Sequence, residues 1–546
     1  MPGATSLRLS LIETREMKAF SALYSRLDAT SSTKAKTQAL AEYFETASPQ
    51  DAAWAVWFLS GNRPQRLLPA RTLAELACAQ ADIPLWLFEE CYAAVGDLAE
   101  TVALLLPGTG GDSELGLSEW IEQRLLGLRG LDDAARKESI TRSWNDLDPA
   151  GRFVWNKLIT GQFRVGVSKL LVLRALSTVS GLTVKVLSER FVGAWEPTAE
   201  RYELLIGEAT IQSLGQPYPF FLAHALHDEL ATFESSFGPI AHWLVEWKWD
   251  GIRAQLVRRG GEAWLWSRGE ELITERFPEI VAASEHLPDG TVLDGELMAW
   301  EGDGPLPFAL LQKRIGRKTL TPKVLASAPA TLVCFDLLED GGADLRERPM
   351  RERRALLEVR VGAGRANLRV SERLSAVDWI QLKSQRDDAR ARGVEGLMLK
   401  RLDSAYGIGR TRGPWWKWKL EPMSVDAVLV YAQRGHGRRA SLYTDYTFAV
   451  WDDGALVPFA KAYSGLSDDE IRGVDDFIRR NTSEKFGPVR SVKPSIVCEI
   501  GFEGIQRSNR HKSGVAVRFP RILKLRTDKT PAEADDISVL KALLHE

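Results

Sequence analysis

Apolar residues recur at three- and four-residue intervals through most of the first 205 residues of the chain. The stretches AEYFETASPQDAAWAVWFLSG (residues 41–61) and RTLAELACAQADIPLWLFEECYAAVGDLAETVALLLP (residues 71–107) both carry this helical period. Ser48 followed by Pro49 is a typical helix start. Glycines and polar residues at 108–116 indicate a surface loop. The pattern predicts an all-α domain over residues 1–205.

From Gln216 the hydrophobic period shortens to two. Alternating segments such as WLVEWKWDGIRAQLV, TVLDGELMAW, ATLVCFDLL and WWKWKL indicate strands, with helices and turns between them. This mixture predicts an α+β domain over residues 216–420. After Glu421-Pro422, about five further short strands are interrupted by one helix, SDDEIRGVDDFIRR. That pattern predicts a C-terminal β-barrel of the OB-fold kind over residues 423–546.

Composition narrows the class of protein. The chain has 546 residues, of which 45% are hydrophobic and 26% charged, as in a multidomain globular protein. Its four cysteines form no C-x-x-C pair, so neither a zinc ribbon nor a redox motif is predicted. No signal peptide and no run of about 18 apolar residues is visible. We therefore expect a cytoplasmic protein with no membrane partner.

Charge is distributed unevenly along the chain. The 71 basic and 73 acidic residues give a net charge of −2, which by itself argues against a nucleic-acid partner. Residues 151–190, however, hold seven Lys/Arg and one acid, and residues 501–530 hold eight Lys/Arg and two acids. Residues 81–150 compensate with fourteen acids against five bases. Separate basic patches of this kind suit contacts with DNA phosphates, although any one of them could be an ordinary solvated face.

The candidate chemistry begins at the octapeptide from Glu246 to Arg253, EWKWDGIR. On a strand, alternate residues share a face, so Glu246, Lys248 and Asp250 point one way while Trp247 and Trp249 point into a core. A surface strand with a ladder of ion pairs would give the same pattern, so the octapeptide alone does not decide.

The same alternation recurs downstream. It places Lys417 with Lys419, and Asp294 with Glu296, on common faces of their strands. A lysine nucleophile, carboxylates, an aromatic residue and phosphate-seeking cations are what an enzyme that activates a nucleotide needs.

Lys248-x-Asp250-Gly251-x-Arg253 resembles the first motif of the covalent nucleotidyltransferases, and further motifs of that superfamily follow it in the expected order and at similar spacing. The later elements are Ser267-Arg268, Asp294-Gly295-Glu296, Phe335-Asp336, Glu395-Gly396 to Lys400, Lys417-x-Lys419 and Arg526-x-Asp528-Lys529. The specific resemblance is to ATP-dependent DNA ligases of the bacterial type with a helical N-terminal DNA-binding domain. It covers nearly the whole chain. The segment from Lys157 to Val167 is similar to the minor-groove-binding segment of that domain.

The resemblance implies a three-step reaction. Lys248 attacks the α-phosphate of ATP, AMP passes to the 5′-phosphate at a nick in duplex DNA, and the 3′-OH then closes the strand with release of AMP. An ordinary lysine has a pKa of about 10.4, so the attacking form must be favoured by nearby cations. Mg²⁺ or Mn²⁺ is the implied cofactor, with Glu296 and Glu395 as its ligands.

The resemblance also assigns the remaining contacts. Those expected for ATP are Glu246, Arg253, Arg268, Glu296, Phe335, Arg410, Arg412, Lys417, Lys419, Arg526 and Lys529. Glu246 is expected at the adenine amino group and Phe335 on the adenine face, with core packing as the alternative for Phe335. The spacing leaves open which of Arg410 and Arg412 reaches phosphate. The expected DNA contacts are Arg164, Lys157, Lys169, Arg268, Arg438 and Arg439, in a monomer that encircles the duplex in replication or repair.

Three alternatives remain. An RNA ligase or capping-type guanylyltransferase shares the Lys-x-Asp-Gly chemistry, but the helical N-terminal block and the Arg-x-Asp-Lys ending argue against it. An NAD-dependent ligase is disfavoured by the absence of a zinc-type cysteine set. A nick-binding protein without catalysis is disfavoured because every residue that the chemistry needs is present.

Overall fold

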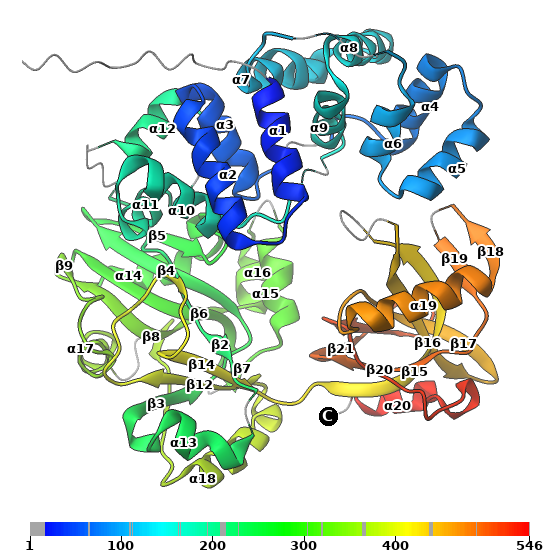
Figure 1. Ribbon diagram of the computed structural model, residues 1–546. Coiled ribbons are helices and arrows are strands. Elements are labelled where there is room, and N and C mark those ends of the chain that lie inside the picture. Colours follow the sequence, from blue (N-terminus) through cyan, green and yellow to red (C-terminus); the bar gives the residue numbers. More distant parts are fainter. Residues whose placement is uncertain are drawn as a thin grey trace, which may run out of the picture. The chain divides into compact units, whose positions relative to one another are not determined.

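The computed structural model describes residues 17–544, except 64–65, 109–110, 112, 162, 164, 194, 208–213, 228, 303, 318–319, 363–366, 436–440 and 488. The described chain divides into two compact units (Figure 1). One combines Met1–Gly181, Glu196–Glu203 and Pro422–Glu546, and the other combines Leu182–Trp195 and Leu204–Glu421. Each unit is described by itself below.

The N-terminal part of the first unit is helical, as the hydrophobic period predicts. Its helices are α1 (Met17–Asp28), α2 (Thr33–Thr46), α3 (Pro49–Leu59), α4 (Ala70–Ala81), α5 (Leu85–Val95), α6 (Leu98–Leu105), α7 (Leu117–Glu119), α8 (Asp133–Asp146), α9 (Pro149–Ile159), α10 (Lys169–Ser180) and α12 (Ala199–Ile206), the last reaching into the second unit. The predicted start at Ser48-Pro49 is confirmed, because Ser48 accepts a hydrogen bond from the Asp51 amide. Among the described residues, no single helix is long and apolar enough to cross a membrane, although α10 and the following helix pass that test together as a pair bent by 116°.

The second unit is built on two sheets. The larger has the strand order β10-β8-β6-β4-β5 and the smaller the order β11-β3-β12-β14-β2 (Figure 1). Their strands are β2 (His224–Ala225), β3 (Trp243–Trp247), β4 (Ile252–Arg259), β5 (Glu262–Ser267), β6 (Thr291–Glu301), β8 (Ala330–Asp340), β10 (Leu368–Val370), β11 (Arg373–Leu374), β12 (Gly396–Arg401) and β14 (Trp415–Lys419). Two short strands extend the larger sheet, β7 (Gly304–Pro305) beside β6 and β9 (Ala343–Asp344) beside β8, and β1 (Phe221–Leu222) pairs separately with β13 (Gly409–Arg410).

Helices bury the outer faces of these sheets. They are α13 (Phe233–Phe237), α14 (Pro278–Ser284), α15 (Phe308–Ile315), α17 (Met350–Val361) and α18 (Trp379–Asp387). The unit also contains α11 (Val184–Arg190) and α16 (Pro322–Ser327). Leu357 of α17 joins Leu293, Leu332 and Cys334 in the core of the larger sheet. In Figure 1, α13 and α18 lie beside the strands of the smaller sheet. Phe233 of α13 and Trp379 of α18 join Trp247 in the core of that sheet. Between the sheets lies a further apolar cluster that includes Leu244, Val257 and Trp415, and the polar candidates of the inner faces lie beside it.

The C-terminal part of the first unit is a curled, strand-rich sheet with the order β17-β16-β15-β19-β18. Its elements are β15 (Met423–Arg434), β16 (Tyr443–Asp452), β17 (Ala455–Ala462), α19 (Asp468–Arg480), β18 (Thr482–Phe486), β19 (Val489–Val492), β20 (Val497–Phe502), β21 (Gly504–Arg507), β22 (Val515–Arg518), β23 (Arg521–Leu525) and α20 (Ile537–Ala542). β15 bends at a register shift after Leu429, so that its first half pairs with β20 and its second half with β19. The described part holds nine strands where about five were expected: the pattern missed β18, β19 and β21, and a turn divides the last predicted segment into β22 and β23.

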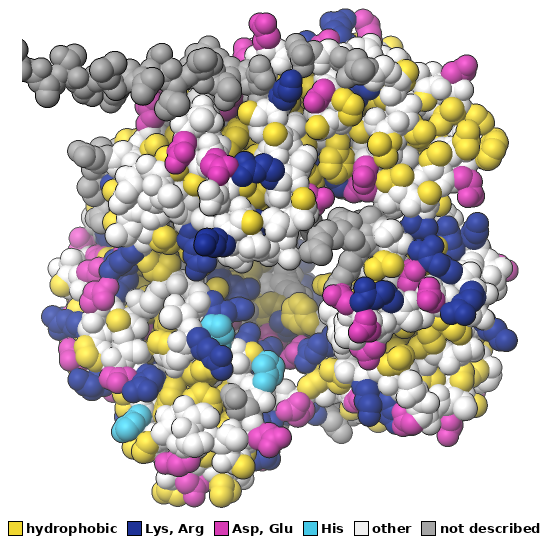
Figure 2. Space-filling model, viewed as in Figure 1, with side chains coloured by type: hydrophobic (Ala, Val, Ile, Leu, Met, Phe, Trp, Pro, Cys, Tyr) yellow, Lys and Arg dark blue, Asp and Glu magenta, His cyan; other side chains and the backbone are white. Residues whose placement is uncertain are grey.

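The cysteines and the surface agree with the composition. All four cysteines are free thiols. On the face shown in Figure 2, basic and acidic side chains lie interspersed over the surface. The helices and strands described above confirm the fold class predicted from the pattern: a helical N-terminal part, an α+β middle and a strand-rich C-terminal part.

Candidate active site

Lys248 lies at the end of β3, where the strand meets the start of β12. The Lys248 amide donates to the Gly396 carbonyl at 2.8 Å, and the Glu395 amide donates to the Lys248 carbonyl at 2.8 Å. These two backbone bonds bring the Lys248 ammonium into an ion pair with the Glu395 carboxylate. The strand ends at Trp247 instead of continuing to Asp250, so the lysine lies on a strand end and not within a ladder.

The predicted alternation along β3 is confirmed. Val245 and Trp247 join the aromatic core against α13 and α18, whereas Leu244 lies in the cluster between the sheets and Glu246 faces that side as well. Glu246 is only 1% exposed and pairs with two buried cations. The side chain is therefore held inside the domain and is not part of a surface ion-pair ladder.

Two further lysines, Lys417 and Lys419, lie on β14, which pairs with β12, the strand that follows Glu395. The register sets Lys419 opposite Gly396 and Lys417 opposite Met398, while Trp416 and Trp418 fill the core behind them. The Lys419 ammonium is 3.2 Å from the Glu395 carboxylate. Burial, and then the charges of Lys419, Lys248 and Arg410, lower the pKa of Lys417. The predicted common face of the two lysines is confirmed, and it carries a concentration of positive charge.

Glu395 responds to that charge. Burial acts against its ionised form, but Lys248 and Lys419 outweigh burial and hold the pKa of Glu395 below its usual value. Glu395 is therefore an anion in a cationic surrounding.

Glu296 lies on the neighbouring sheet, opposite Arg253 in the register of β4 and β6. Burial raises the pKa of Glu296 to about 7, although Lys248 and Arg253 act in the opposite direction. The charge of Glu395 also raises it, so the two carboxylates are near enough to repel each other. Two carboxylates that repel each other beside a cluster of lysines fit a divalent cation, which takes one or two carboxylates together with other oxygen ligands. Among the described residues, no group of three or more His, Cys, Asp or Glu could enclose a metal by itself.

Arg253 is fixed by a residue that was predicted only as part of a motif. Its guanidinium donates twice to Asp294, at 3.1 and 2.7 Å, and once to the Phe221 carbonyl at 2.5 Å. The Tyr406 hydroxyl donates to Asp294 at 2.6 Å. Burial opposes the cation, but Asp294 outweighs it and raises the pKa of Arg253. The guanidinium also lies 5.4 Å from the Phe335 ring, so both belong to one cluster.

The aromatic candidate Phe335 lies half-buried beside Lys400. The Lys400 ammonium is 4.1 Å from the centre of the Phe335 ring and 2.6 Å from the Glu246 carboxylate. Met398 and Phe335 both pack on the same cluster between the sheets. The structure thus brings Glu246 and Phe335 together through Lys400.

Two glycines of the motifs are required by close packing. A Cβ on Gly251 would lie 2.2 Å from the Leu297 carbonyl oxygen and 2.6 Å from the Met298 sulfur. A Cβ on Gly396 would lie 2.3 Å from the Trp418 carbonyl oxygen, and Gly396 has φ +131°. Glycine at these two positions therefore lets the Lys248 loop and the Glu395 loop lie close against their neighbouring strands.

The arginines before β14 are placed differently. Arg410 pairs through its backbone with Leu222, and its charge acts on Lys417. Arg412 lies 5.7 Å over the ring of Trp416, on the core side of the strand. Arg268 is exposed at the end of β5, where its amide donates to the Arg253 carbonyl.

The C-terminal candidates form their own cluster in the first unit. Arg526 pairs with Asp426 at 2.8 Å and with Asp528 at 2.8 Å, and Lys529 pairs with Asp426 at 2.5 Å. Asp426 is 7% exposed, on β15. The sequence pattern places Asp528 beside these cations but does not identify Asp426, because it lies 100 residues before Arg526.

The candidate DNA contacts in the helical part are not equivalent. Lys157 is buried and its ammonium pairs with Asp97, so its charge is used inside the helical part. Lys169 is half-buried at the first position of α10. Arg164, Arg438 and Arg439 lie outside the described residues.

Comparison with known proteins covers all three parts of the chain. Residues 16–177 match the family model described as DNA ligase N terminus. Residues 222–419 match the ATP dependent DNA ligase domain, and residues 439–529 match the ATP dependent DNA ligase C terminal region.

Sequence similarity to known proteins covers most of the chain. A probable DNA ligase of Koribacter versatilis is 32% identical, with 93% of each chain covered. DNA ligase 1 of Korarchaeum cryptofilum is 29% identical over 96% of this chain and 98% of its own. A probable DNA ligase of Opitutus terrae is 34% identical over 88% of this chain, which spans 50% of that relative. The solved structure named Pmar-Lig_PreS3 shares the fold, with a TM-score of 0.61 at 18% identity, covering 93% of this chain and 99% of that one. The chain belongs to the family of ATP-dependent DNA ligases.

Proposed function

We propose that this ligase seals nicks in duplex DNA through a covalent adenylate on Lys248. The observation that carries the proposal is the cluster at the end of β3, where Lys248 pairs with Glu395 and Lys417 and Lys419 lie on the adjacent strand. An amine that attacks a phosphate needs cations beside it to bind the phosphate oxygens, and Lys417 and Lys419 are those cations in the proposed reaction.

In the first step, the neutral Lys248 amine attacks the α-phosphorus of ATP, a P–N bond forms, and pyrophosphate leaves. Lys417, Lys419 and Arg410 lie where they would neutralise the charge that builds up on the phosphates. We propose Arg410 and not Arg412 for this role, because Arg410 acts on Lys417 while Arg412 stacks on Trp416.

The nucleoside end is assigned to the other side of the cluster. Glu246 accepts from the adenine amino group, and Phe335 supplies a ring for the base. Arg253 is locked to Asp294, so we propose that it shapes the ribose and phosphate surface from a fixed position.

A divalent cation fits the pair formed by Glu296 and Glu395. When bound, Mg²⁺ or Mn²⁺ would stabilise negative charge on phosphate oxygens. The residues that would hold it are these two carboxylates, one of which is already held as an anion by Lys248 and Lys419.

The second and third steps concern DNA. AMP passes to the 5′-phosphate of the nick, and the 3′-OH then displaces it to form the phosphodiester bond. Arg268, exposed at the end of β5, is the proposed 5′-phosphate contact. Lys169, together with Arg164, Arg438 and Arg439, supplies sequence-independent phosphate contacts, whereas Lys157 is left out because it pairs internally.

Arg526 and Lys529 are proposed to orient the leaving pyrophosphate. They reach this task only when the C-terminal domain closes on the nucleotide, so the reaction includes a domain movement. We propose three functional domains, at residues 1–205, 216–420 and 423–546, in a monomer that encircles its DNA. We also propose that the protein acts in the cytoplasm, a reducing compartment in which its four cysteines would remain free thiols.

The test is adenylation followed by sealing. Protein incubated with α-labelled ATP and Mg²⁺ is expected to give a labelled adduct that is stable to base and labile to acid. Lys248→Ala should abolish the adduct, while Lys383→Ala, an exposed lysine of α18, should leave it unchanged. The wild-type protein should then seal a nicked duplex. An absent adduct from folded protein would exclude the mechanism, and preferential labelling by GTP would favour a capping-type enzyme.

A further inference from the structure

Glu246 is almost completely buried, and its carboxylate lies between two cations. The guanidinium of Arg354 donates to Glu246 Oε1 at 2.5 Å, and the ammonium of Lys400 lies 2.6 Å from Glu246 Oε2. Glu246 and Lys400 are each 1% exposed and Arg354 is 6% exposed. Each oxygen of the carboxylate therefore has a cation of its own.

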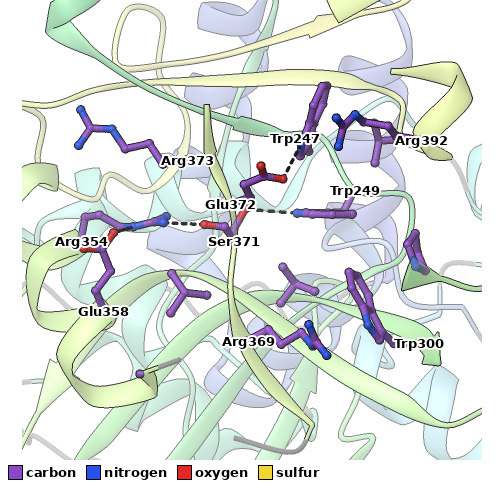
Figure 3. A pocket seen from close by; sticks show the side chains of 15 residues that line it. Trp247, Trp249, Trp300, Arg354, Glu358, Arg369, Ser371, Glu372, Arg373 and Arg392 are labelled. Atoms are coloured by element: carbon purple, nitrogen blue, oxygen red, sulfur yellow. Dashed lines mark hydrogen bonds and ion pairs between the residues drawn. The ribbon is translucent and has the colours of Figure 1, made fainter. Parts of the chain in front are cut away.

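Arg354 comes from α17, outside every motif that the sequence pattern identified. Its guanidinium donates to three acceptors, namely Glu246, the Ser371 carbonyl at 2.5 Å and Glu358 at 2.7 Å. Figure 3 shows Arg354 with Ser371 and Glu358 at the side of a cavity of about 890 Å³. Arg354 and Ser371 line this cavity and Glu246 does not, so the guanidinium separates the carboxylate from it.

The two cations differ in how firmly they keep their charge. Burial lowers the pKa of Lys400, and Glu246 only partly offsets this effect. A guanidinium keeps its charge under all ordinary conditions and holds a carboxylate in a fixed plane through its fork of donors. Arg354 is thus the permanent counter-charge of Glu246, and it also fixes the orientation of the carboxylate.

The orientation and the charge of the Glu246 carboxylate decide which base can form a hydrogen bond with it. An ionised carboxylate only accepts hydrogen bonds. Adenine presents an amino donor at the position where guanine presents a carbonyl acceptor. A carboxylate that is paired with a permanent cation and held in one orientation therefore favours adenine and repels guanine, whereas a loosened one tolerates either.

We propose that Arg354 is a positioning residue which fixes Glu246 and thereby sets the preference of this enzyme for ATP over GTP. This inference rests on the proposed function, in which Glu246 faces the adenine base. The competing role, a plain anchor of α17 to the sheet, predicts lost stability but unchanged base preference.

The variants are Arg354→Met, which keeps an unbranched apolar stem but removes the guanidinium, and Arg354→Lys, which keeps the charge but not the fork. The matched control is Arg314→Met. Arg314 is also buried and forms a two-bonded pair with a glutamate, Glu279, in the same unit. Nucleotide preference is measured as the ratio of initial adenylation rates with α-labelled ATP and GTP, together with the KM for ATP.

Arg354→Met should raise the KM for ATP and lower the ATP-to-GTP ratio, each by about tenfold or more, the factor carried by one hydrogen bond to a charged group. Arg354→Lys should fall between this variant and the wild type. Arg314→Met should lower the melting temperature and keep the wild-type ratio.

A folded Arg354→Met with the wild-type ratio would overturn the inference. If Arg354→Met does not fold, Arg354→Lys decides, and a wild-type ratio there would overturn it equally. No adduct from the wild-type protein with either nucleotide would be a failure of the proposed function, which this design separates from a failure of the inference.

Discussion

The ammonium of Lys248 and the carboxylate of Glu395 form an ion pair although 147 residues separate them in the chain. Two backbone hydrogen bonds between the ends of β3 and β12 create this pair, so its geometry depends on the sheet and not on side-chain length alone. The same carboxylate serves Lys419, which makes Glu395 the negative centre of a cationic site.

Replacing Glu395 by Gln should leave the neighbouring ammonium groups without that counter-charge. We expect inorganic pyrophosphate, added without metal, to raise the melting temperature of Glu395→Gln more than that of the wild type. Adenylation in Mg²⁺ should fall about 100-fold or more, since a proposed ligand and a positioning charge are lost together. Glu234→Gln, an exposed change of the same charge, is the control. Equal pyrophosphate shifts in all three proteins would contradict the prediction.

Glu296 should make stability depend on pH. Burial raises its pKa from 4.5 to about 7, so the folded protein holds a proton that the unfolded chain has lost between these values. The resulting stability is fully present below pH 4.5 and is lost as pH rises through 7, by roughly 2 kcal/mol for a partly exposed group.

Glu296→Gln removes this dependence. Its melting temperature relative to the wild type should increase between pH 5 and pH 8 in the absence of metal and nucleotide. Glu301→Gln, at the exposed end of the same strand, should show no such trend. A constant difference across the pH range would mean that Glu296 is ionised throughout.

Asp426 should be needed for adenylation but not for the final sealing step. It holds both Arg526 and Lys529, whereas Asp528 pairs with Arg526 alone and is largely exposed. We expect Asp426→Asn to raise the KM for ATP by about tenfold, since two charge-assisted contacts lose their anchor. Asp528→Asn should have a smaller effect.

Both Asp426→Asn and Asp528→Asn should seal a nick that is already adenylated at the wild-type rate. A matching loss in that assay would point to general damage to the domain, and circular dichroism provides an independent check of its folding.

The two lysines of the helical part should behave oppositely. Lys157→Met leaves Asp97 buried without its partner and should cost about 3 kcal/mol of stability, with the salt dependence of DNA binding unchanged. Lys169→Ala should reduce the slope of log affinity against log salt by about 0.9. Binding of nicked duplex measured by anisotropy at several salt concentrations distinguishes these outcomes.

The local pattern predicted the elements that depend on neighbouring residues. Alternation along β3 and β14 correctly separated Glu246 from Trp247 and Lys417 from Trp418. The helix start at Ser48 followed from capping chemistry within four residues. The sequence could not show that β3 ends at Trp247, because the pairing of Lys248 with Gly396 is a long-range event.

The partners of the candidate residues were mostly beyond reach of the pattern. Arg354 is one of several charged residues on helix α17, and Asp426 is a single acid on the mostly apolar strand β15. Nothing in the sequence around either residue distinguishes it from a surface charge. Lys157 lies in a basic segment of the sequence, yet the fold buries it against Asp97. The distinction requires the distance between residues 60 positions apart, which periodicity does not contain.

The two units are not continuous in sequence, and this affects how the catalytic part could be isolated. Leu182–Trp195 belongs to the α+β unit, where Glu189 pairs with Arg346 at 2.7 Å and the Val192 carbonyl accepts from Gln216. A fragment that started at residue 216 would lose this segment and leave the largely buried guanidinium of Arg346 with Asp344 as its remaining carboxylate partner. Supplying 182–195 as a separate peptide should therefore restore part of the thermal stability of such a fragment, which makes α11 a detachable component of the catalytic unit.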